Sequence, residues 1–327
     1  MRLCVYGAGA IGGNLAARFA KGGAEVSIVA RGAHLAAIRA NGLTMHAHDG
    51  THLCHPKASD DPADLGPQDA VIVTVKTPAL PDVARGIAPL LRADTPVVFV
   101  MNGIPWWYFD HHGGPHDGMR LDAADPGEAL RRAIGVERAI GGVVYTAAEV
   151  TAPGVVHSEH GNIRLILGEP DGRTSDRARA ISAVLEAGGM PCPVSPDIRT
   201  EVWSKLLGNL SSGPICLLTR MGVRDSFADP LVREAARTSA REGMAIAAAL
   251  GRPLPASVVD RVANSTMAHK PSILQDLELG RPTEIATLFE LPLQLARLAG
   301  VATPQLDLLV ALARQAARAA GVYPPIT

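Results

Sequence analysis

The stretch that decides the fold is LCVYGAGAIG, residues 3–12. A short apolar strand pattern runs into a G-x-G-x-x-G motif, and a helical pattern follows at once. In this context the first glycine makes a tight turn, the second lets a pyrophosphate approach the backbone, and the third allows the helix to pack on the strand. The motif therefore predicts a dinucleotide site, with an ordinary glycine-rich turn as the alternative. The predicted cofactor-binding residues here are Gly7, Ala8, Gly9, Ala10, Ile11 and Gly12.

The end of the second strand indicates which nicotinamide cofactor binds. This strand is expected over residues 25–30 and is followed by Arg31, with no acidic residue at its end. An NAD enzyme places an acid there to hold the ribose 2′-hydroxyl, whereas an arginine accommodates a 2′-phosphate. The sequence favours NADP(H), and a solvated surface arginine is the alternative.

Strands and helices alternate through the first half of the chain. Apolar runs at residues 70–75 and 96–101 flank a helical stretch, a pattern typical of parallel strands with crossovers. The β-rich segments 141–147 and 154–167 are expected to extend the sheet edge in antiparallel fashion. From residue 196 on, helical patterns prevail: Val202, Leu206 and Leu210 form an apolar stripe at four-residue steps, and Asp229 is expected to cap a helix that begins at Pro230. We expect an α/β Rossmann-type domain over residues 1–195 and an all-α domain over residues 196–327.

Composition and charge exclude several classes of protein. Hydrophobic residues make up 47% of the 327 residues, and 31 basic residues balance 32 acidic ones to a net charge of −1. Nucleic-acid and anionic-lipid binding need a clear basic excess, and no apolar run approaches the ~20 residues that cross a bilayer. The start lacks the apolar stretch of a signal peptide, and the four cysteines lie far apart as expected of reduced thiols. We expect a cytoplasmic location.

Several segments together resemble the ketopantoate reductase (2-dehydropantoate 2-reductase) family, over nearly the whole chain. The resemblance implies a Rossmann domain joined to a helical domain like the C-terminal one of 6-phosphogluconate dehydrogenase, with the active site in the cleft between them. It also implies reduction of a 2-oxo acid with NADPH, as in pantothenate biosynthesis. The matching segments are Gly7 to Gly12, Arg31, Val75-Lys76, Asn102-Gly103-Ile104, Trp203 to Leu206 with Asn209, Pro271 to Asp276, and Arg281 to Ile285.

The resemblance assigns roles to individual residues. Lys205 corresponds to the family's catalytic lysine and Glu284 to its essential acid. Asn102 corresponds to the residue near the nicotinamide and substrate, and Lys76 to the one near the cofactor ribose. The implied substrate contacts further along the chain are Asn209 and Ser272.

Two positions depart from the family pattern. Gly213 stands where the family usually has a second asparagine, four residues beyond Asn209. His269 stands three residues before Ser272, where an asparagine is common. Both lie in the part that holds the substrate, so the sequence supports ketone reduction better than it supports ketopantoate as the ketone.

The chemistry of ketone reduction can also be read from the residues themselves. Hydride transfer builds negative charge on the carbonyl oxygen, which a cation or acid must stabilise and protonate. Lys205 shares a predicted helix face with Glu201 and Asn209, and a surface Glu201–Lys205 ion pair is the alternative. Capping is the corresponding alternative for Thr283-Glu284 and for Ser272, and turn formation is the alternative for Asn102.

Three further features have no assigned function. Asp49-Gly50 is a hairpin signal, and pairing across it puts His46, His48 and His55 on one face and His52 on the other; we expect a polar hairpin and no metal site. Residues 106–116 form an aromatic and histidine-rich loop that would serve as a lid or an oligomer contact. Pro292 should kink its helix.

The expected function is NADPH-dependent reduction of a 2-oxo acid to a 2-hydroxy acid, with 2-dehydropantoate to pantoate favoured. One alternative is a related NADP-dependent enzyme acting on another 2-oxo or 3-hydroxy acid. A second is a redox sensor that binds NADP(H) without turnover, although such a sensor would need neither Lys205 nor Glu284. The expected partner is a small 2-oxo acid, and a homodimer is compatible with the sequence.

Overall fold

The chain divides into two compact units. A computed structural model describes residues 1–158 and 163–324. The first unit comprises residues 1–101 and 105–198, and the second comprises residues 102–104 and 199–327. The division after residue 198 lies close to the expected boundary at 195/196. That residues 102–104 belong to the second unit had no signal in the sequence.

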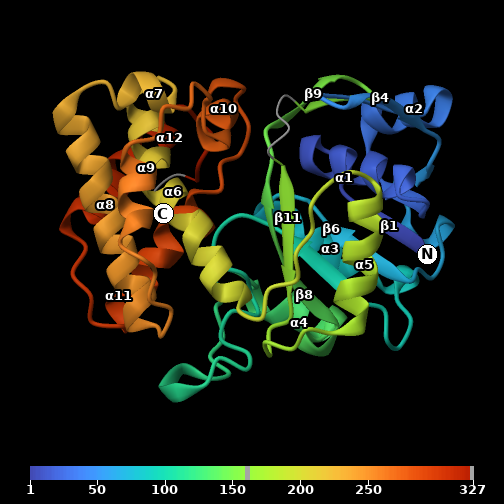
Figure 1. Ribbon diagram of the computed structural model, residues 1–327, viewed down its shortest axis with the longest axis horizontal. Coiled ribbons are helices and arrows are strands. Elements are labelled where there is room, and N and C mark those ends of the chain that lie inside the picture. Colours follow the sequence, from blue (N-terminus) through green and yellow to red (C-terminus); the bar gives the residue numbers. More distant parts are fainter. Residues whose placement is uncertain (159–162, 325–327) are drawn as a thin grey trace. The chain divides into compact units, whose positions relative to one another are not determined.

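The first unit is built on a seven-stranded sheet with the order β11-β8-β7-β6-β1-β2-β5 (Figure 1). All neighbouring strands in it pair in parallel except β11 with β8. This is the Rossmann-type domain that the glycine motif predicts. Its strands are β1 (Arg2–Tyr6), β2 (Glu25–Val29), β5 (Lys57–Ser59), β6 (Ala70–Val73), β7 (Val97–Val100), β8 (Ala139–Tyr145) and β11 (Arg164–Gly168).

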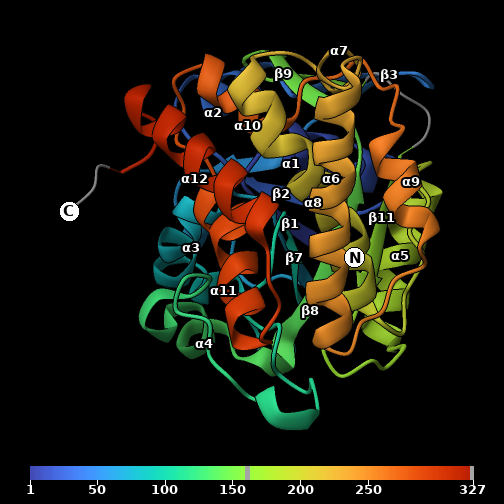
Figure 2. The same ribbon diagram turned by 90° about the vertical axis from the view of Figure 1, so that its left-hand side faces the viewer.

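Helices cover both faces of this sheet, as Figures 1 and 2 show. On one face, Phe19 and Ile181 join a core cluster with alternate strand residues such as Leu3 and Val5. Because side chains alternate along a strand, the residues between them face the other side of the sheet. The helices of this unit are α1 (Ala10–Lys21), α2 (Gly32–Asn41), α3 (Leu80–Gly86), α4 (Ala129–Ile134) and α5 (Asp176–Ala187).

A second, four-stranded sheet corrects part of the expectation. Only β11 extends the main sheet in antiparallel fashion, since β8 continues it in parallel. The rest of the β-rich region pairs instead with the hairpin of β3 (Leu43–Ala47) and β4 (Gly50–Cys54). The strands concerned are β9 (Ala148–Ala152) and β10 (Val155–Ser158), in the order β4-β3-β10-β9. Pairing of β10 with β3 joins segments distant in sequence, which local patterning does not reveal.

The predicted hairpin is confirmed, with its turn one residue earlier, at residues 48–49. His46 pairs with Thr51 and is exposed, whereas His52 pairs with the buried Met45, so these two histidines face opposite sides. The described part of the chain contains no group of three or more His, Cys, Asp or Glu side chains that could hold a metal ion. Instead the turn residue Asp49 bonds Arg18 of α1, at 3.3 and 3.4 Å.

The aromatic loop is not available as a lid or an oligomer contact through its rings. Trp106, Trp107 and Tyr108 are at most 3% exposed, and Trp106 meets Phe99 edge-on at 5.6 Å. Arg131 lies over the Trp106 ring, 5.1 Å from its centroid. The sequence shows aromatic residues in a loop, but not that they are buried.

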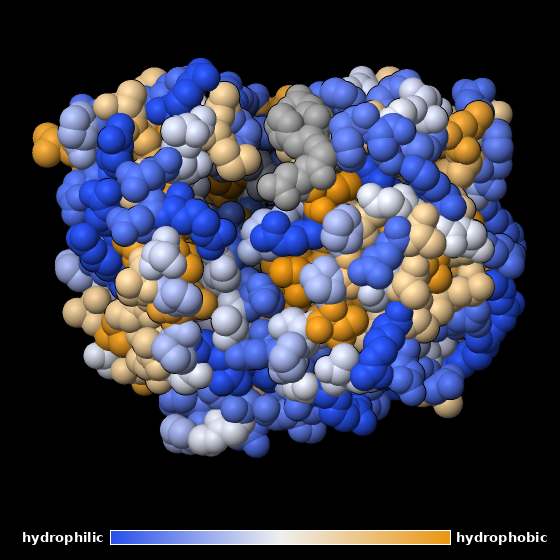
Figure 3. Space-filling view, viewed as in Figure 1, coloured by the Kyte–Doolittle hydropathy of each residue, from blue (hydrophilic) through white to orange (hydrophobic). Residues whose placement is uncertain are grey.

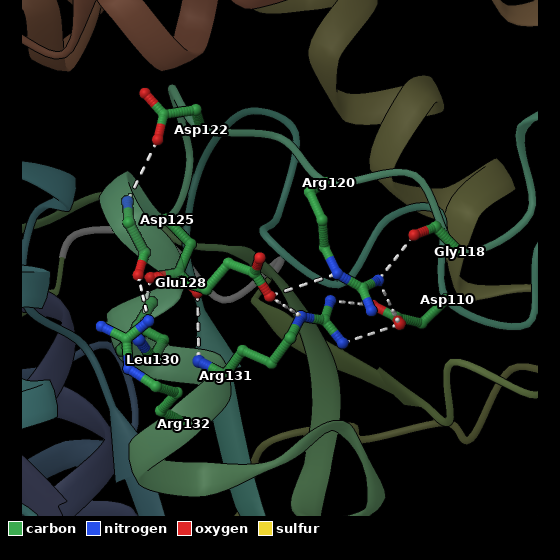
Figure 4. A network of polar contacts seen from close by, with 10 residues as sticks. Asp110, Gly118, Arg120, Asp122, Asp125, Glu128, Leu130, Arg131 and Arg132 are labelled. Atoms are coloured by element: carbon green, nitrogen blue, oxygen red, sulfur yellow. Dashed lines mark hydrogen bonds and ion pairs between the residues drawn. The ribbon is translucent and has the colours of Figure 1, made fainter.

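A polar network ties the rest of this loop to α4 (Figure 4). Arg131 donates to both oxygens of Asp110, at 2.8 and 2.5 Å. Arg120 donates to the same carboxylate at 3.3 Å and pairs with Glu128, also at 3.3 Å. These charges neutralise one another, which is typical of a structural anchor rather than a ligand site.

The second unit is helical, as expected. The expected N-cap Asp229 accepts bonds from the N–H groups of Leu231 and Val232. No helix among residues 1–158 and 163–324 is long and apolar enough to cross a membrane. The helices are α6 (Ile198–Thr219), α7 (Val223–Ser226), α8 (Pro230–Ala249), α9 (Ser257–Ala263), α10 (Ser272–Glu278), α11 (Leu291–Leu298) and α12 (Pro304–Ala319).

A π-helical turn accommodates Pro292. Residues 286–290 form this turn directly before α11, in which Pro292 lies in the first turn. A proline ring clashes with the carbonyl four residues earlier, and the wider π turn moves that carbonyl away. The predicted irregularity is therefore a widened turn that begins right after Glu284 and Ile285.

The state of the cysteines and the hydropathy of the surface are those that the sequence predicts. Cys4, Cys54, Cys192 and Cys216 are free thiols; Cys54 is half-buried and the others are buried. Burial raises the pKa of Cys4 to about 12, so this thiol is unreactive. Figure 3 shows hydrophilic side chains over much of the visible surface, with apolar ones scattered among them.

Candidate active site

The glycine turn has the backbone that the motif requires. Gly7 has a φ of 105°, and a Cβ there would lie 2.6 Å from Cγ1 of Val75. Its carbonyl accepts a bond from the Thr74 hydroxyl at 2.5 Å. Since Thr74 comes directly after β6, the neighbouring strand fixes the turn. Sequence analysis missed this threonine, because only strand pairing brings it to the motif.

The other two glycines differ in what surrounds them. A Cβ at Gly12 would lie 1.9 Å from the Gly7 carbonyl oxygen, so helix and turn are too close for any side chain. A Cβ at Gly9 would meet nothing within 4 Å. Gly9 precedes α1, whose first turn carries no acidic residue. The open space, and the N–H groups that a helix start leaves without an intrahelical partner, fit the pyrophosphate of a dinucleotide.

His34 is a residue near this turn that sequence analysis missed. Its Nδ1 accepts a bond from the Gly154 N–H at 2.9 Å, which fastens the β9–β10 turn to α2. Burial lowers the pKa of His34, and the backbone of Ala8 opposes this effect. The lowered pKa favours the neutral ring, in which Nδ1 can accept the Gly154 N–H. A single histidine in a helix gives no sequence signal for this role.

Arg31 lies at the end of β2, where the sequence predicts the residue that selects the nicotinamide cofactor. It follows β2 as the N-cap of α2, and its side chain is 67% exposed. Both Nη1 and Nη2 lie 3.3 Å from one oxygen of Asp82, a residue of α3. Arg31 is thus an accessible cation at the strand end, but it is paired rather than simply solvated.

Lys76 lies at the same edge of the sheet. It comes just after β6, which pairs in parallel with β1 so that Val73 is opposite Tyr6. The carboxyl ends of these strands therefore place Lys76 and the glycine turn at one edge, where α/β sheets bind ligands. Lys76 is exposed and begins the segment leading into α3.

Lys205, in the helical unit, has a strongly shifted pKa. It lies on α6, whose stripe of Val202, Leu206 and Leu210 is buried as predicted. Burial lowers the pKa of Lys205 to about 8, and the charge of Glu284 opposes this shift. A carboxylate far along the chain therefore acts on this amine. A lysine with a pKa near 8 is well suited to donate a proton at physiological pH.

Backbone hydrogen bonds fix the segment that carries Glu284. It is 8% exposed and precedes the π turn, where its carbonyl accepts a bond from the Leu288 N–H at 2.9 Å. The adjacent Thr283 donates its N–H to the Val322 carbonyl at 3.1 Å and its hydroxyl at 3.4 Å. The capping alternative is wrong for Thr283, because its hydroxyl bonds the C-terminal segment instead. A nearly buried carboxylate in electrostatic reach of Lys205 results.

Asn102 belongs with these residues in the helical unit. The following Gly103 has a φ of 84°, and a Cβ there would lie 2.6 Å from the Thr287 carbonyl oxygen. Thr287 is in the π turn that follows Glu284. The turn is therefore found, and it brings the chain close to the segment that follows Glu284, whereas the functional role of Asn102 stays a prediction.

Asn209 and Ser272 come from two helices that meet near Gly213. Asn209 is partly buried, one turn beyond Lys205 on α6. Ser272 is the exposed first residue of α10, and the cap position before it is Pro271 with no side-chain bond, so the capping alternative is wrong for Ser272. A Cβ at Gly213 would lie 3.7 Å from Ile273, the residue after Ser272.

Family models identify the chain. The model "Ketopantoate reductase PanE/ApbA" matches residues 3–108, and "Ketopantoate reductase PanE/ApbA C terminal" matches residues 197–317. A 2-dehydropantoate 2-reductase of Mesorhizobium japonicum is 45% identical, over 99% of this chain and 100% of its own. The chain belongs to the ketopantoate reductase family.

Other members of the ketopantoate reductase family have the same fold. A candidate ketopantoate reductase from Ralstonia solanacearum has a TM-score of 0.91 and 39% identity, over 98% of this chain and 99% of that one. The 2-dehydropantoate 2-reductase from Geobacter metallireducens has a TM-score of 0.85 and 30% identity, over 97% and 100%. Both likenesses span both units of the chain.

The departure at Gly213 has a physical reason in this ketopantoate reductase family member. A Cβ there would lie 2.6 Å from Cζ of Phe289, so the aromatic ring fills the space of a side chain. An asparagine at this position would collide with the ring. The other departure, His269, is exposed, and its carbonyl accepts a bond from the Val223 N–H at 3.2 Å.

Proposed function

We propose that this protein reduces ketopantoate to pantoate with NADPH, a reaction of pantothenate biosynthesis. The observation that carries the proposal is the electrostatic environment of Lys205. Burial lowers its pKa to about 8, and the nearby charge of Glu284 opposes this shift. The 2-dehydropantoate 2-reductase that is 45% identical to this chain supports ketopantoate as the substrate. The 2-hydroxy acid product follows from adding a hydride to the keto carbon and a proton to its oxygen.

The chemistry assigned to the residues of the helical unit is proton transfer and substrate binding. The nicotinamide supplies the hydride when it is bound. Protonated Lys205 stabilises the negative charge that develops on the substrate oxygen and then donates its proton there. Glu284 keeps the amine charged before reaction, because its carboxylate raises the pKa of Lys205 against the effect of burial. We assign substrate contacts to Asn102, Asn209 and Ser272.

The glycine turn and the residues around it are proposed to hold NADP(H). The residues present fit a dinucleotide, since the space beside Gly9 is open and α1 begins there. Gly7 to Gly12 bind the pyrophosphate, Lys76 lies toward the cofactor ribose, and Arg31 binds the 2′-phosphate. The exposed guanidinium of Arg31 at the end of β2 supports NADPH over NADH.

The cellular setting is also proposed. Free, mostly buried cysteines fit a reducing compartment, and we propose the cytoplasm. We further propose that residues 1–195 and 196–327 are the two domains, which the division after residue 198 supports. We also propose that the protein binds a small 2-oxo acid as its substrate and forms a homodimer.

The test is NADPH oxidation by the purified protein with a panel of 2-oxo acids that includes ketopantoate. We expect ketopantoate to give the highest kcat/KM, and NADPH to be used in preference to NADH. The panel should contain 2-oxo acids with larger and smaller apolar side chains, because Phe289 occupies the space at Gly213. Turnover of another acid in preference to ketopantoate would contradict the substrate, and absence of turnover with every acid would contradict the reaction.

A further inference from the structure

The arginine proposed to bind the 2′-phosphate is already engaged by a carboxylate. Arg31 donates from Nη1 and Nη2 to Oδ2 of Asp82, both at 3.3 Å. The Arg31 side chain is 67% exposed and that of Asp82 is 37% exposed. Asp82 comes from α3, in the segment that begins with Lys76, so it lies on a different strand connection from Arg31.

Asp82 is shared between two arginines. Its other oxygen, Oδ1, pairs with Arg85 one turn further along α3. The carboxylate can therefore stay neutralised by Arg85 when Arg31 binds another anion. Asp82 and Asp61 both act on the Tyr6 hydroxyl, whose pKa is raised chiefly by burial and lowered by Arg31. Arg31 and Asp82 thus act on the same hydroxyl with opposite effects on its pKa.

We propose that Asp82 is a specificity-determining residue that competes with the 2′-phosphate of NADPH for Arg31. The inference rests on the proposed function, because it assumes that Arg31 faces this phosphate. NADPH binding must separate Arg31 from Asp82 or place two anions on one guanidinium, whereas NADH binding requires neither. Asp82 therefore lowers the affinity for NADPH, but not that for NADH, and so reduces the ratio of the two affinities.

The effect should be modest, because the pair is exposed. Exposed ion pairs contribute little to stability, and the corresponding gain in NADPH affinity on removing Asp82 is about 2- to 5-fold. Asp82→Asn and Asp82→Ala keep Arg31 and the glycine turn intact. The matched control is Asp60→Asn, which removes the same charge from a carboxylate that pairs with Arg39 at 3.7 Å.

The experiment measures dissociation constants of NADPH and NADH for the wild type and these variants, with a thermal melt to confirm folding. We expect both Asp82 variants to bind NADPH about 2- to 5-fold more tightly and NADH with unchanged affinity. Asp60→Asn should leave both constants unchanged. In an Arg31→Ala background, Asp82→Asn should no longer tighten NADPH binding, because the competition acts through that guanidinium.

Three results would overturn the inference. They are equal tightening of both cofactors, weaker NADPH binding in the Asp82 variants, and a gain in NADPH affinity that persists without Arg31. Each leaves the proposed function standing if the wild type still reduces ketopantoate with NADPH. Failure of the wild type to bind NADPH would instead overturn the proposed function and this inference together.

Discussion

The glycine turn and the Lys205–Glu284 pair differ in how their function is encoded. The turn depends on consecutive residues, with Gly7 and Gly12 required by backbone geometry and close packing. The pair depends on α6 and on a distant segment of the chain, and its electrostatics arise only when folding partly buries Lys205 within reach of the Glu284 charge. A dinucleotide site can therefore be recognised from local sequence, whereas recognising the proton donor that we propose needs the fold or a family resemblance.

The largest expected effect is on turnover in Lys205→Ala. If Lys205 protonates the substrate oxygen, kcat should fall about 10²- to 10⁴-fold, with NADPH affinity unchanged. The measurement is steady-state turnover at saturating NADPH with the best 2-oxo acid. The control is Lys270→Ala, which removes an exposed lysine paired with Glu278 at 2.6 Å and should keep wild-type turnover. Near-wild-type turnover of Lys205→Ala would remove this residue from the mechanism.

The second effect concerns Arg31→Ala. A charge-assisted hydrogen bond contributes about 1.5–3 kcal/mol, so loss of Arg31 should weaken NADPH binding about 10- to 150-fold. NADH binding should barely change. The measurement is the dissociation constants of NADPH and NADH for the wild type and for Arg31→Ala. An equal loss for both cofactors, or none for either, would show that Arg31 does not bind the 2′-phosphate.

The third and smallest effect separates two glycines of the same turn. Gly12→Ala places a Cβ 1.9 Å from the Gly7 carbonyl, and such overpacking should lower the free energy of unfolding by about 1–3 kcal/mol. Gly9→Ala has open space and should keep wild-type stability while weakening cofactor binding. Denaturant unfolding and cofactor titration of both variants test this. Equal destabilisation by the two substitutions would contradict the assigned roles.

Sequence patterns predicted the elements better than they predicted how the elements meet. The glycine turn, the end of β2 at Arg31, the helix start at Asp229 and the buried stripe of α6 all depend on neighbouring residues, and all are found. The pairing of β10 with β3 was not predicted, because register between distant strands has no local signature.

The candidate site shows the same limit. Lys205 and Glu284 were named through the family resemblance, and burial of the amine supplies the physical reason that spacing alone could not. Thr74, His34 and Asp82 were missed because each acts on a residue from another strand or helix. The burial of the aromatic loop residues likewise depends on contacts such as that of Trp106 with Phe99.

The pH dependence of kcat/KM for ketopantoate, at saturating NADPH, tests the central claim most directly. In the proposed mechanism the acid form of Lys205 is the active one, and burial lowers its pKa to about 8. We therefore predict that kcat/KM is constant below this pH and falls tenfold per pH unit above it. Lys205→Arg should lose this limb, because a guanidinium stays protonated. A profile that stays flat until about pH 10, where an ordinary lysine titrates, would contradict the account.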